Sequence, residues 1–430
     1  MLMSLSLSQK IGKMSLAKRL ITAFGITDEV FAVASTTPIA ITFPFMNLAA
    51  AFGSLVGVGA STLVAIKLGQ KDKESATHVL GNVVMLNGII GLVFMTVALL
   101  FLDPILLFFG ASPDTLPYAR EYMQVILAGN LVTHIYMGLN EVLRASGYPQ
   151  KAMAATLTAV IVNCGLDALF IMGFGWGIRG AALATITAQI IALGFELHHF
   201  SRKKSFLHFQ KGIFGLKRQI VGGMLAIGLS PFLMNLCACF VVILINKSLK
   251  TYGGDLAIGA YGIVNRIVFL FIMIVMGFNQ GMQPIAGYNF GARLFDRLIQ
   301  VLKYTVFCGV AVTTVGFLAG QIFPRSLICL FTSDETLTNI AVEGLRIVLI
   351  FFPVVGFQMV TSSFFQSIGM AKKAIFLSLT RQLLFLIPSL LVFPSIWGTV
   401  GVWMSMPVAD CIATIVAACM LRWQLKRLKA

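Results

Sequence analysis

The chain has 430 residues, of which 58% are hydrophobic and 11% are charged, and its formal net charge is +16 at pH 7. Soluble domains average roughly 45 to 50% apolar and about 25% charged residues, so this composition excludes an ordinary soluble protein and indicates one that spans a membrane. The positive charge does not indicate nucleic-acid binding, because the basic residues are dispersed over short connections without an aromatic-studded basic surface.

The first 30 residues form a basic segment without an apolar run of spanning length. Apolar stretches then alternate with short connections, and most approach the roughly 20 residues that cross the hydrocarbon of a bilayer. Residues 31–197 form an amino-terminal lobe with stretches at 31–66, 79–101, 122–143, 152–175 and 180–197. After a basic linker at 198–218, residues 219–421 form a carboxy-terminal lobe with stretches at 219–246, 256–290, 301–323, 340–365, 374–397 and 398–421, followed by a basic tail at 422–430. We predict an all-α integral membrane protein with about eleven transmembrane helices.

The two lobes repeat each other at a spacing of about 222 residues. The motif Trp176-Gly177-x-x-Gly180 returns as Trp397-Gly398-x-x-Gly401, and three glycine pairs recur at the same spacing, namely Gly59 and Gly281, Gly69 and Gly291, and Gly147 and Gly369. The chain contains 4 tryptophans, so duplication explains the match better than chance. We predict two pseudo-symmetric helix bundles related as parallel repeats.

The stretch at 219–246 has no partner in the first lobe, because its counterpart would fall before residue 25. Either the natural start lies upstream, or the helix has been replaced by a basic segment on the membrane surface. We favour a truncated or shifted start, because eleven crossings with a cytoplasmic carboxyl end would put the basic amino terminus outside, against the charge rule.

Basic residues gather on alternate connections between the stretches. The positive-inside rule places these connections in the cytoplasm. We therefore predict a multi-pass protein of the cell membrane, here a bacterial inner membrane, with a cytoplasmic carboxyl end. The residues are Lys67, Lys71, Lys73, Arg144, Lys151, Arg202, Lys203, Lys204, Lys217, Arg218, Arg293, Arg297, Lys303, Lys372, Lys373, Arg422, Lys426 and Arg427.

Asp167 lies deep in the stretch at 152–175, with Asn163 four residues earlier on the same helical face. The next stretch carries Thr185 and Gln189, again four residues apart. An ionisable side chain within a membrane is costly and normally faces a cavity or a partner. We predict that Asn163, Asp167 and Thr185 couple transport to a proton or to a sodium ion bound at Asp167. The alternative is an acid held protonated to bridge two helices.

Further polar residues within the stretches offer an additional pathway. Arg266, Arg381 and Asp410 lie near the middles of three stretches in the second lobe. We interpret them as a mutually neutralising network, with a substrate or gating role as the alternative. We interpret His134 as a hydrogen-bonded buried side chain, with a proton relay as the alternative. Gln189 extends the polar strip of the coupling site.

Enzyme signatures are missing from the sequence. There is no phosphate-binding Gly-x-x-x-x-Gly-Lys-Ser/Thr loop, no His-Glu-x-x-His, no Gly-x-Ser-x-Gly and no Cys/His constellation. The 7 cysteines lie in or beside apolar stretches without zinc spacing. We therefore expect no enzymatic activity and no cofactor, and no metal beyond a coupling sodium ion.

Four segments resemble the multidrug and toxic compound extrusion (MATE) family: GVGASTLVAIKLGQKDKE at 57–74, LRASGYPQKAMAATLTAVIVNCGLDALFIMGFGWGIRGAALATITAQ at 143–189, AIGAYGIVNRIVFLFIMIVMGFNQGMQPIAGYNFGA at 257–292 and FFQSIGMAKKA at 364–374. The resemblance implies a twelve-helix exporter with two six-helix lobes, a central cleft, and exchange of a cationic compound for inward-moving sodium or protons. It also implies that Asn163, Asp167 and Thr185 match the family's amino-lobe coupling site. The aspartate expected on the first helix has no match, and Asn235 and Gln358 stand where some relatives carry carboxyl-lobe acids.

These features together predict a secondary active antiporter that exports cationic or amphipathic drugs and toxic compounds. Its expected partners are small cationic or lipophilic substrates and membrane lipids, with no nucleic acid, and we expect a monomer. A second interpretation is a flippase for lipid-linked precursors, which would need a cationic groove. A third is a truncated membrane protein that transports nothing.

Overall fold

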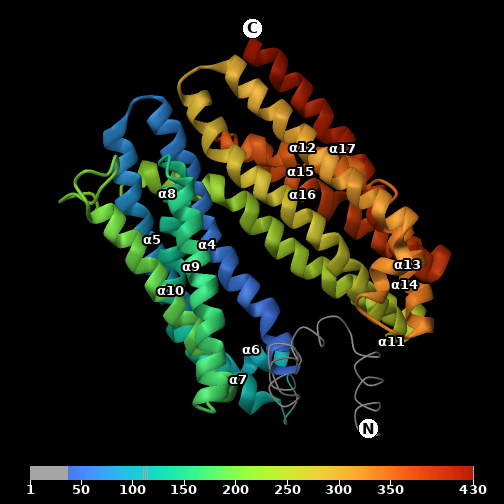
Figure 1. Ribbon diagram of the computed structural model, residues 1–430. Coiled ribbons are helices and arrows are strands. Elements are labelled where there is room, and N and C mark those ends of the chain that lie inside the picture. Colours follow the sequence, from blue (N-terminus) through green and yellow to red (C-terminus); the bar gives the residue numbers. More distant parts are fainter. Residues whose placement is uncertain (1–36, 110, 112, 114, 430) are drawn as a thin grey trace, which may run out of the picture.

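The computed structural model describes residues 37–109, 111, 113 and 115–429, and the regular elements in these ranges are all helices. Figure 1 shows two bundles. The first contains α4 (Thr37–Gly69), α5 (Lys73–Leu100), α6 (Leu102–Phe108), α7 (Leu116–Ala128), α8 (Asn130–Ala145), α9 (Pro149–Asp167), the π-helix η1 (Ala168–Gly173) and α10 (Gly177–Ser201). The second contains α11 (Arg218–Gly291), α12 (Phe295–Ile322), α13 (Pro324–Cys329), α14 (Glu335–Val348), α15 (Phe352–Ser367), α16 (Ala371–Leu379), the π-helix η2 (Thr380–Leu386) and α17 (Ile387–Lys429). The chain is thus an all-α membrane protein with two bundles, as the sequence predicts.

Seven helices of the described part are long and apolar enough to cross a membrane, or up to eight if the bent pair of α14 and α15, which meet at 56°, counts as one span. Two of the seven are double helices in sequence, because α11 has 74 residues and turns back at Gly254 (φ 67°), and α17 breaks at Gly398 (φ 59°). α7 and α8 share the predicted stretch 122–143 but have only 13 and 16 residues. Merged and bent helices therefore account for the difference from the predicted number of stretches.

The duplication is also present in the backbone. α5 and α12 begin and end 222 residues apart, and so do α8 and α15. Lys71 (φ 62°) and Arg293 (φ 58°) both adopt the left-handed conformation at this same spacing. Non-glycine residues rarely take this conformation, so its recurrence at equivalent positions supports a common origin of the two lobes.

The two lobes meet where α4 packs against α11. Gly59 lies so close to α11 that an added Cβ would overlap the backbone of Met224, and Gly291 lies equally close to the backbone of Ile66. Only a residue without a Cβ permits such an approach. The rings of Phe52 and Phe232, 4.9 Å apart between centroids, extend the contact. Glycine thus holds the lobes together at this end.

This contact lies at the end of the molecule that carries the basic connections. The connection between α10 and α11 covers residues 202–217 and packs on the first lobe through Asn82, whose Nδ2 donates to the Gly215 carbonyl (3.0 Å) and whose Oδ1 accepts from the Lys217 amide (3.0 Å). Away from this end the two bundles diverge (Figure 1). The lobes are therefore joined on the basic side and separate on the other.

The predicted basic segment at 1–30 and the predicted lack of a first helix lie outside the described residues. The stretch at 31–66 is described from residue 37 onward, where α4 begins.

Candidate functional site

The predicted coupling residues lie on two neighbouring helices of the first lobe. Asn163 and Asp167 belong to α9, and Thr185 belongs to α10, which packs along α9. The Asn163 Nδ2 donates to Thr185 Oγ1 at 3.3 Å, and the Thr185 hydroxyl donates onward to the Ala181 carbonyl at 3.0 Å. The bond leaves the Asn163 side-chain oxygen available to accept from a proton-bearing group or to bind a cation.

Asp167 is the last residue of α9, and the chain continues from it into the π-helix η1. Wide turns of this kind occur often at functional sites, because they change the direction in which neighbouring side chains point. Asp167 is half-buried, and its Oδ1 is enclosed with no hydrogen-bond partner. Tyr122 of α7 lies within electrostatic reach of it. A carboxylate oxygen enclosed without a donor is completed by a proton or by a small cation.

Gln189 lies one turn beyond Thr185 on α10 and accepts a hydrogen bond at Oε1 from Thr133 Oγ1 of α8. The adjacent His134 is fully buried, and its Nε2 lies 3.0 Å from the Ala49 carbonyl of α4, whereas its Nδ1 has no partner. The polar strip on α10 is therefore bonded to α9 at one level and to α8 at the next, while His134 bonds to α4.

In the second lobe the structure brings together two of the three predicted charges. Arg381 Nε donates to Asp410 Oδ1, and Asp410 is 7% exposed. Arg266 is exposed and has no hydrogen bond or ion pair to any described residue. The pair of Arg381 and Asp410 is thus neutral in itself, and Arg266 is not part of it.

A second polar cluster at the foot of the first lobe was not predicted from the sequence. It consists of Asn140, Glu141 and Arg144 of α8, Glu196 of α10 and Gln280 of α11. Glu196 lies eleven residues after Thr185, so the helical spacing of the strip could have indicated it. Its place beside His198 and His199, at the end of the stretch 180–197, instead suggested a residue at the membrane surface.

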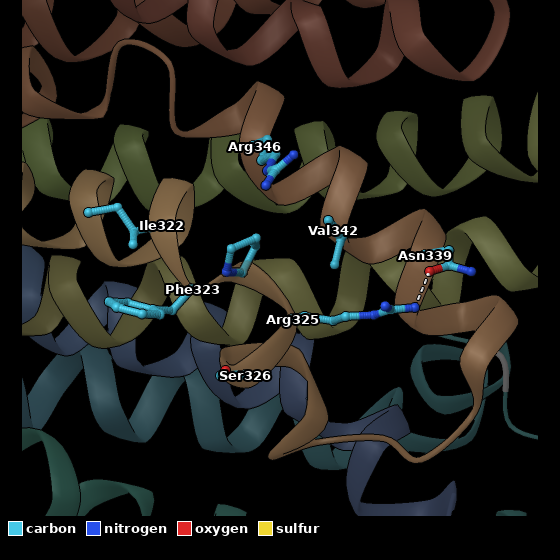
Figure 2. A pocket seen from close by; sticks show the side chains of 8 residues that line it. Ile322, Phe323, Arg325, Ser326, Asn339, Val342 and Arg346 are labelled. Carbon is cyan, nitrogen blue, oxygen red and sulfur yellow. Dashed lines mark hydrogen bonds between the residues drawn. The ribbon is translucent and has the colours of Figure 1, made fainter.

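Two surface cavities lie apart from these residues. One of about 380 Å³ is formed by α12, α13 and α14, where Arg325 donates to Asn339 Oδ1 at 3.1 Å (Figure 2). The other, of about 350 Å³, lies between α7 and the start of α10, where Arg179 pairs with Glu121 at 3.1 Å. Neither cavity is lined by a residue of the predicted coupling site.

Comparison with known proteins places these features in a family context. The family model described as MatE matches residues 29–169 and 227–391. The chain is similar to "Multidrug export protein MepA" of Staphylococcus haemolyticus, with 28% identity over 383 residues that cover 88% of this chain and 83% of that protein. Its namesake from Staphylococcus aureus is 27% identical over 387 residues, with the same two coverages.

Solved structures show the same likeness. A structure of the "MATE multidrug transporter DinF-BH" has 31% sequence identity and a TM-score of 0.83, and the match covers 91% of this chain and 87% of that one. An "outward-facing conformation of a multidrug resistance MATE family transporter of the MOP superfamily" has 25% identity and a TM-score of 0.85, with coverages of 91% and 88%.

Proposed function

This chain belongs to the MatE family of transporters, and we propose that it is a secondary active antiporter that exports cationic or amphipathic compounds in exchange for sodium or protons. The observation that carries the proposal is the enclosed Asp167 Oδ1, which has no hydrogen-bond partner and lies one helical turn from the bond between Asn163 and Thr185. The names of the relatives, which describe multidrug export, support the substrate class.

In the proposed cycle, a cation enters from the side on which the bundles diverge and binds Asp167. Ionised, that carboxylate favours a state in which it reaches water, because an uncompensated charge is costly in low dielectric. Neutralised, it tolerates a closed environment, so the first lobe rearranges around α9 and α10 and the substrate leaves outward. The cation thereby shifts the balance between two lobe arrangements, since it binds one of them better.

We further propose that the protein lies in the cell membrane as a monomer, with the lobe contact and the carboxyl end on the cytoplasmic side. The basic connections at the lobe contact support this orientation through the positive-inside rule. A flippase for lipid-linked precursors ranks lower, because it would need several free cations for a pyrophosphate. Arg381 is engaged by Asp410, which leaves Arg266 alone among the two arginines considered.

Cells that express the chain test the proposal through accumulation of ethidium, a fluorescent lipophilic cation. The Asp167→Asn variant keeps the side-chain shape and removes the charge, so we expect accumulation to rise to that of cells without the protein. Asp255→Asn is the matched control, because Asp255 is exposed beside the turn of α11, and we expect it to export like the parent chain. Export by Asp167→Asn at the parental rate, at equal membrane abundance, would overturn the assignment.

A further inference from the structure

Glu196 is the most enclosed acid of the first lobe, with no exposed surface. Its Oε1 accepts from Asn140 Nδ2 at 2.8 Å, whereas its Oε2 is buried without a hydrogen-bond partner. A full negative charge on this carboxylate is met by one neutral amide, and that is too little compensation for a group removed from water. The geometry leaves one oxygen that a proton would complete.

Arg144 connects this acid to the second lobe. Its Nη2 donates to Asn140 Oδ1 at 3.1 Å, and its Nη1 lies 3.5 Å from Glu141 Oε1. The same Nη1 donates to Gln280 Oε1 of α11 at 2.8 Å, across the boundary between the lobes. The guanidinium is 17% exposed, so it is shared between the acid cluster and the lobe contact.

The charges of this cluster do not balance. Glu141 and Glu196 lie within electrostatic reach of each other and share the single Arg144. Lys151 is occupied elsewhere, with its Nζ 3.2 Å from His199 Nδ1 and 4.6 Å from the ring centre of Tyr148. α11 contributes the neutral Gln280. The titratable and charged groups around Glu196 are Tyr136, Glu141 and Arg144 on α8, Lys151 on α9, and His198 and His199 on α10. With both acids ionised, the cluster carries one negative charge in excess.

We propose that Glu141 and Glu196 share one proton at a second ion-binding site, distinct from Asp167, and that this proton controls the contact between Arg144 and Gln280. With the proton bound, one carboxylate remains charged, and Arg144 can serve it and Gln280 together. When the proton leaves, the second carboxylate draws Arg144 towards α8 and away from Gln280. The lobe contact on the basic side is then weakened. The opening step rests on the proposed transport function, whereas the proton site does not.

α10 offers a physical connection between the two sites. Thr185, Gln189 and Glu196 lie on one face of this helix, and they bond in turn to α9, to α8 and again to α8. A displacement of α10 that follows cation binding at Asp167 would therefore change the position of Glu196 against Asn140. We place the proton site at the basic end of this strip.

Infrared difference spectroscopy of the purified chain in lipid nanodiscs tests the proton site directly, because a protonated carboxyl has its own carbonyl stretch. On acidification we expect a band equal to one carboxyl per chain, and we expect it to be lost in Glu196→Gln and also in Glu141→Gln, since either change removes the excess charge. Persistence of the band in both variants would overturn the proposal. Asp167→Asn should retain it, even though that variant no longer exports, which separates this test from that of the transport function.

Hydrogen–deuterium exchange tests the consequence for the lobe contact. In the parent chain, the second half of α4 and the end of α11 should exchange faster at alkaline than at acid pH. Glu196→Gln and Glu141→Gln should stay protected at both, and Gln280→Ala should exchange fast at both while keeping the infrared band. Equal pH dependence in the parent chain and all three variants would overturn the control of the lobe contact.

Discussion

The two lobes share a backbone but treat their buried acids differently. Among the described residues, the buried acids are Glu196 in the first lobe and Asp410 in the second. Asp410 is paired with Arg381, whereas Glu196 has an amide on one oxygen and nothing on the other. Asp167 likewise retains an oxygen without a partner. The second lobe is therefore neutral within itself, and the first lobe contains the acids that still require a cation.

The π-helices follow the same division. In the first lobe η1 begins directly after Asp167, and in the second lobe η2 includes Arg381. The two wide turns are not at equivalent positions of the repeat, since residue 380 corresponds to residue 158 and not to residue 168. Each lobe has thus placed its wide turn next to its own charged residue, which suggests that duplication supplied the scaffold and later substitutions supplied the chemistry.

Breaking the neutral pair of the second lobe should have the largest effect on stability. Arg381→Gln would leave the Asp410 carboxylate buried without its cation, and we expect the free energy of unfolding to fall by about 3 kcal/mol, the lower end for a buried pair because Arg381 is 29% exposed. Thermal unfolding in detergent micelles measures this change. Adding Asp410→Asn should restore most of the loss, and an unrestored double variant would contradict the pairing.

The lobe contact provides a smaller effect with an internal control. Gly59→Ala would place a Cβ against the backbone of Met224, and we expect a loss of about 1 to 3 kcal/mol in thermal unfolding. Gly281 occupies the equivalent position of the second lobe and has nothing within 4 Å of an added Cβ. Gly281→Ala should therefore be neutral or slightly stabilising. Equal losses at the two positions would show that the approach of α4 and α11 is not as described.

The starts of α5 and α12 should differ by the smallest amount. Asp72 caps α5 by accepting from the Ser75 amide at 3.0 Å, whereas Leu294 at the equivalent position has no side-chain cap for α12. We expect Asp72→Ala to lower stability by about 1 kcal/mol. Leu294→Asp should raise it by less, and an unchanged melting temperature in both variants would contradict the comparison.

Acid should remove the contribution of Asp72. The hydrogen bonds from Ser75, together with the nearby Lys67, lower the pKa of this carboxyl below its ordinary value. Its contribution is therefore complete above the unfolded pKa of about 3.9 and is lost as the pH falls through the lower folded pKa. The difference in melting temperature between the parent chain and Asp72→Ala should shrink over that interval, and a difference that stays constant would argue against the cap.

The sequence was sufficient to predict the lobes, because a duplicated pattern of glycines and tryptophans survives where other residues change. It also placed Asn163 and Thr185 in one site, since their spacing and the family resemblance agree, and the structure joins them by a hydrogen bond. It could not group Glu196 with Asn140. That contact depends on how α8 rotates against α10, and no local spacing records that rotation. For the same reason, the sequence could not separate exposed Arg266 from the paired Arg381.

Proteoliposomes with an imposed sodium or proton gradient offer the most direct test of the central claim, that the acid of the first lobe drives transport. Ethidium movement would be followed for the parent chain, for Asp167→Asn, and for the double variant Arg381→Gln with Asp410→Asn. We predict that Asp167→Asn falls to the level of vesicles without protein, while the double variant still transports. The reverse pattern, with transport retained without Asp167 and lost without the pair of the second lobe, would contradict the account.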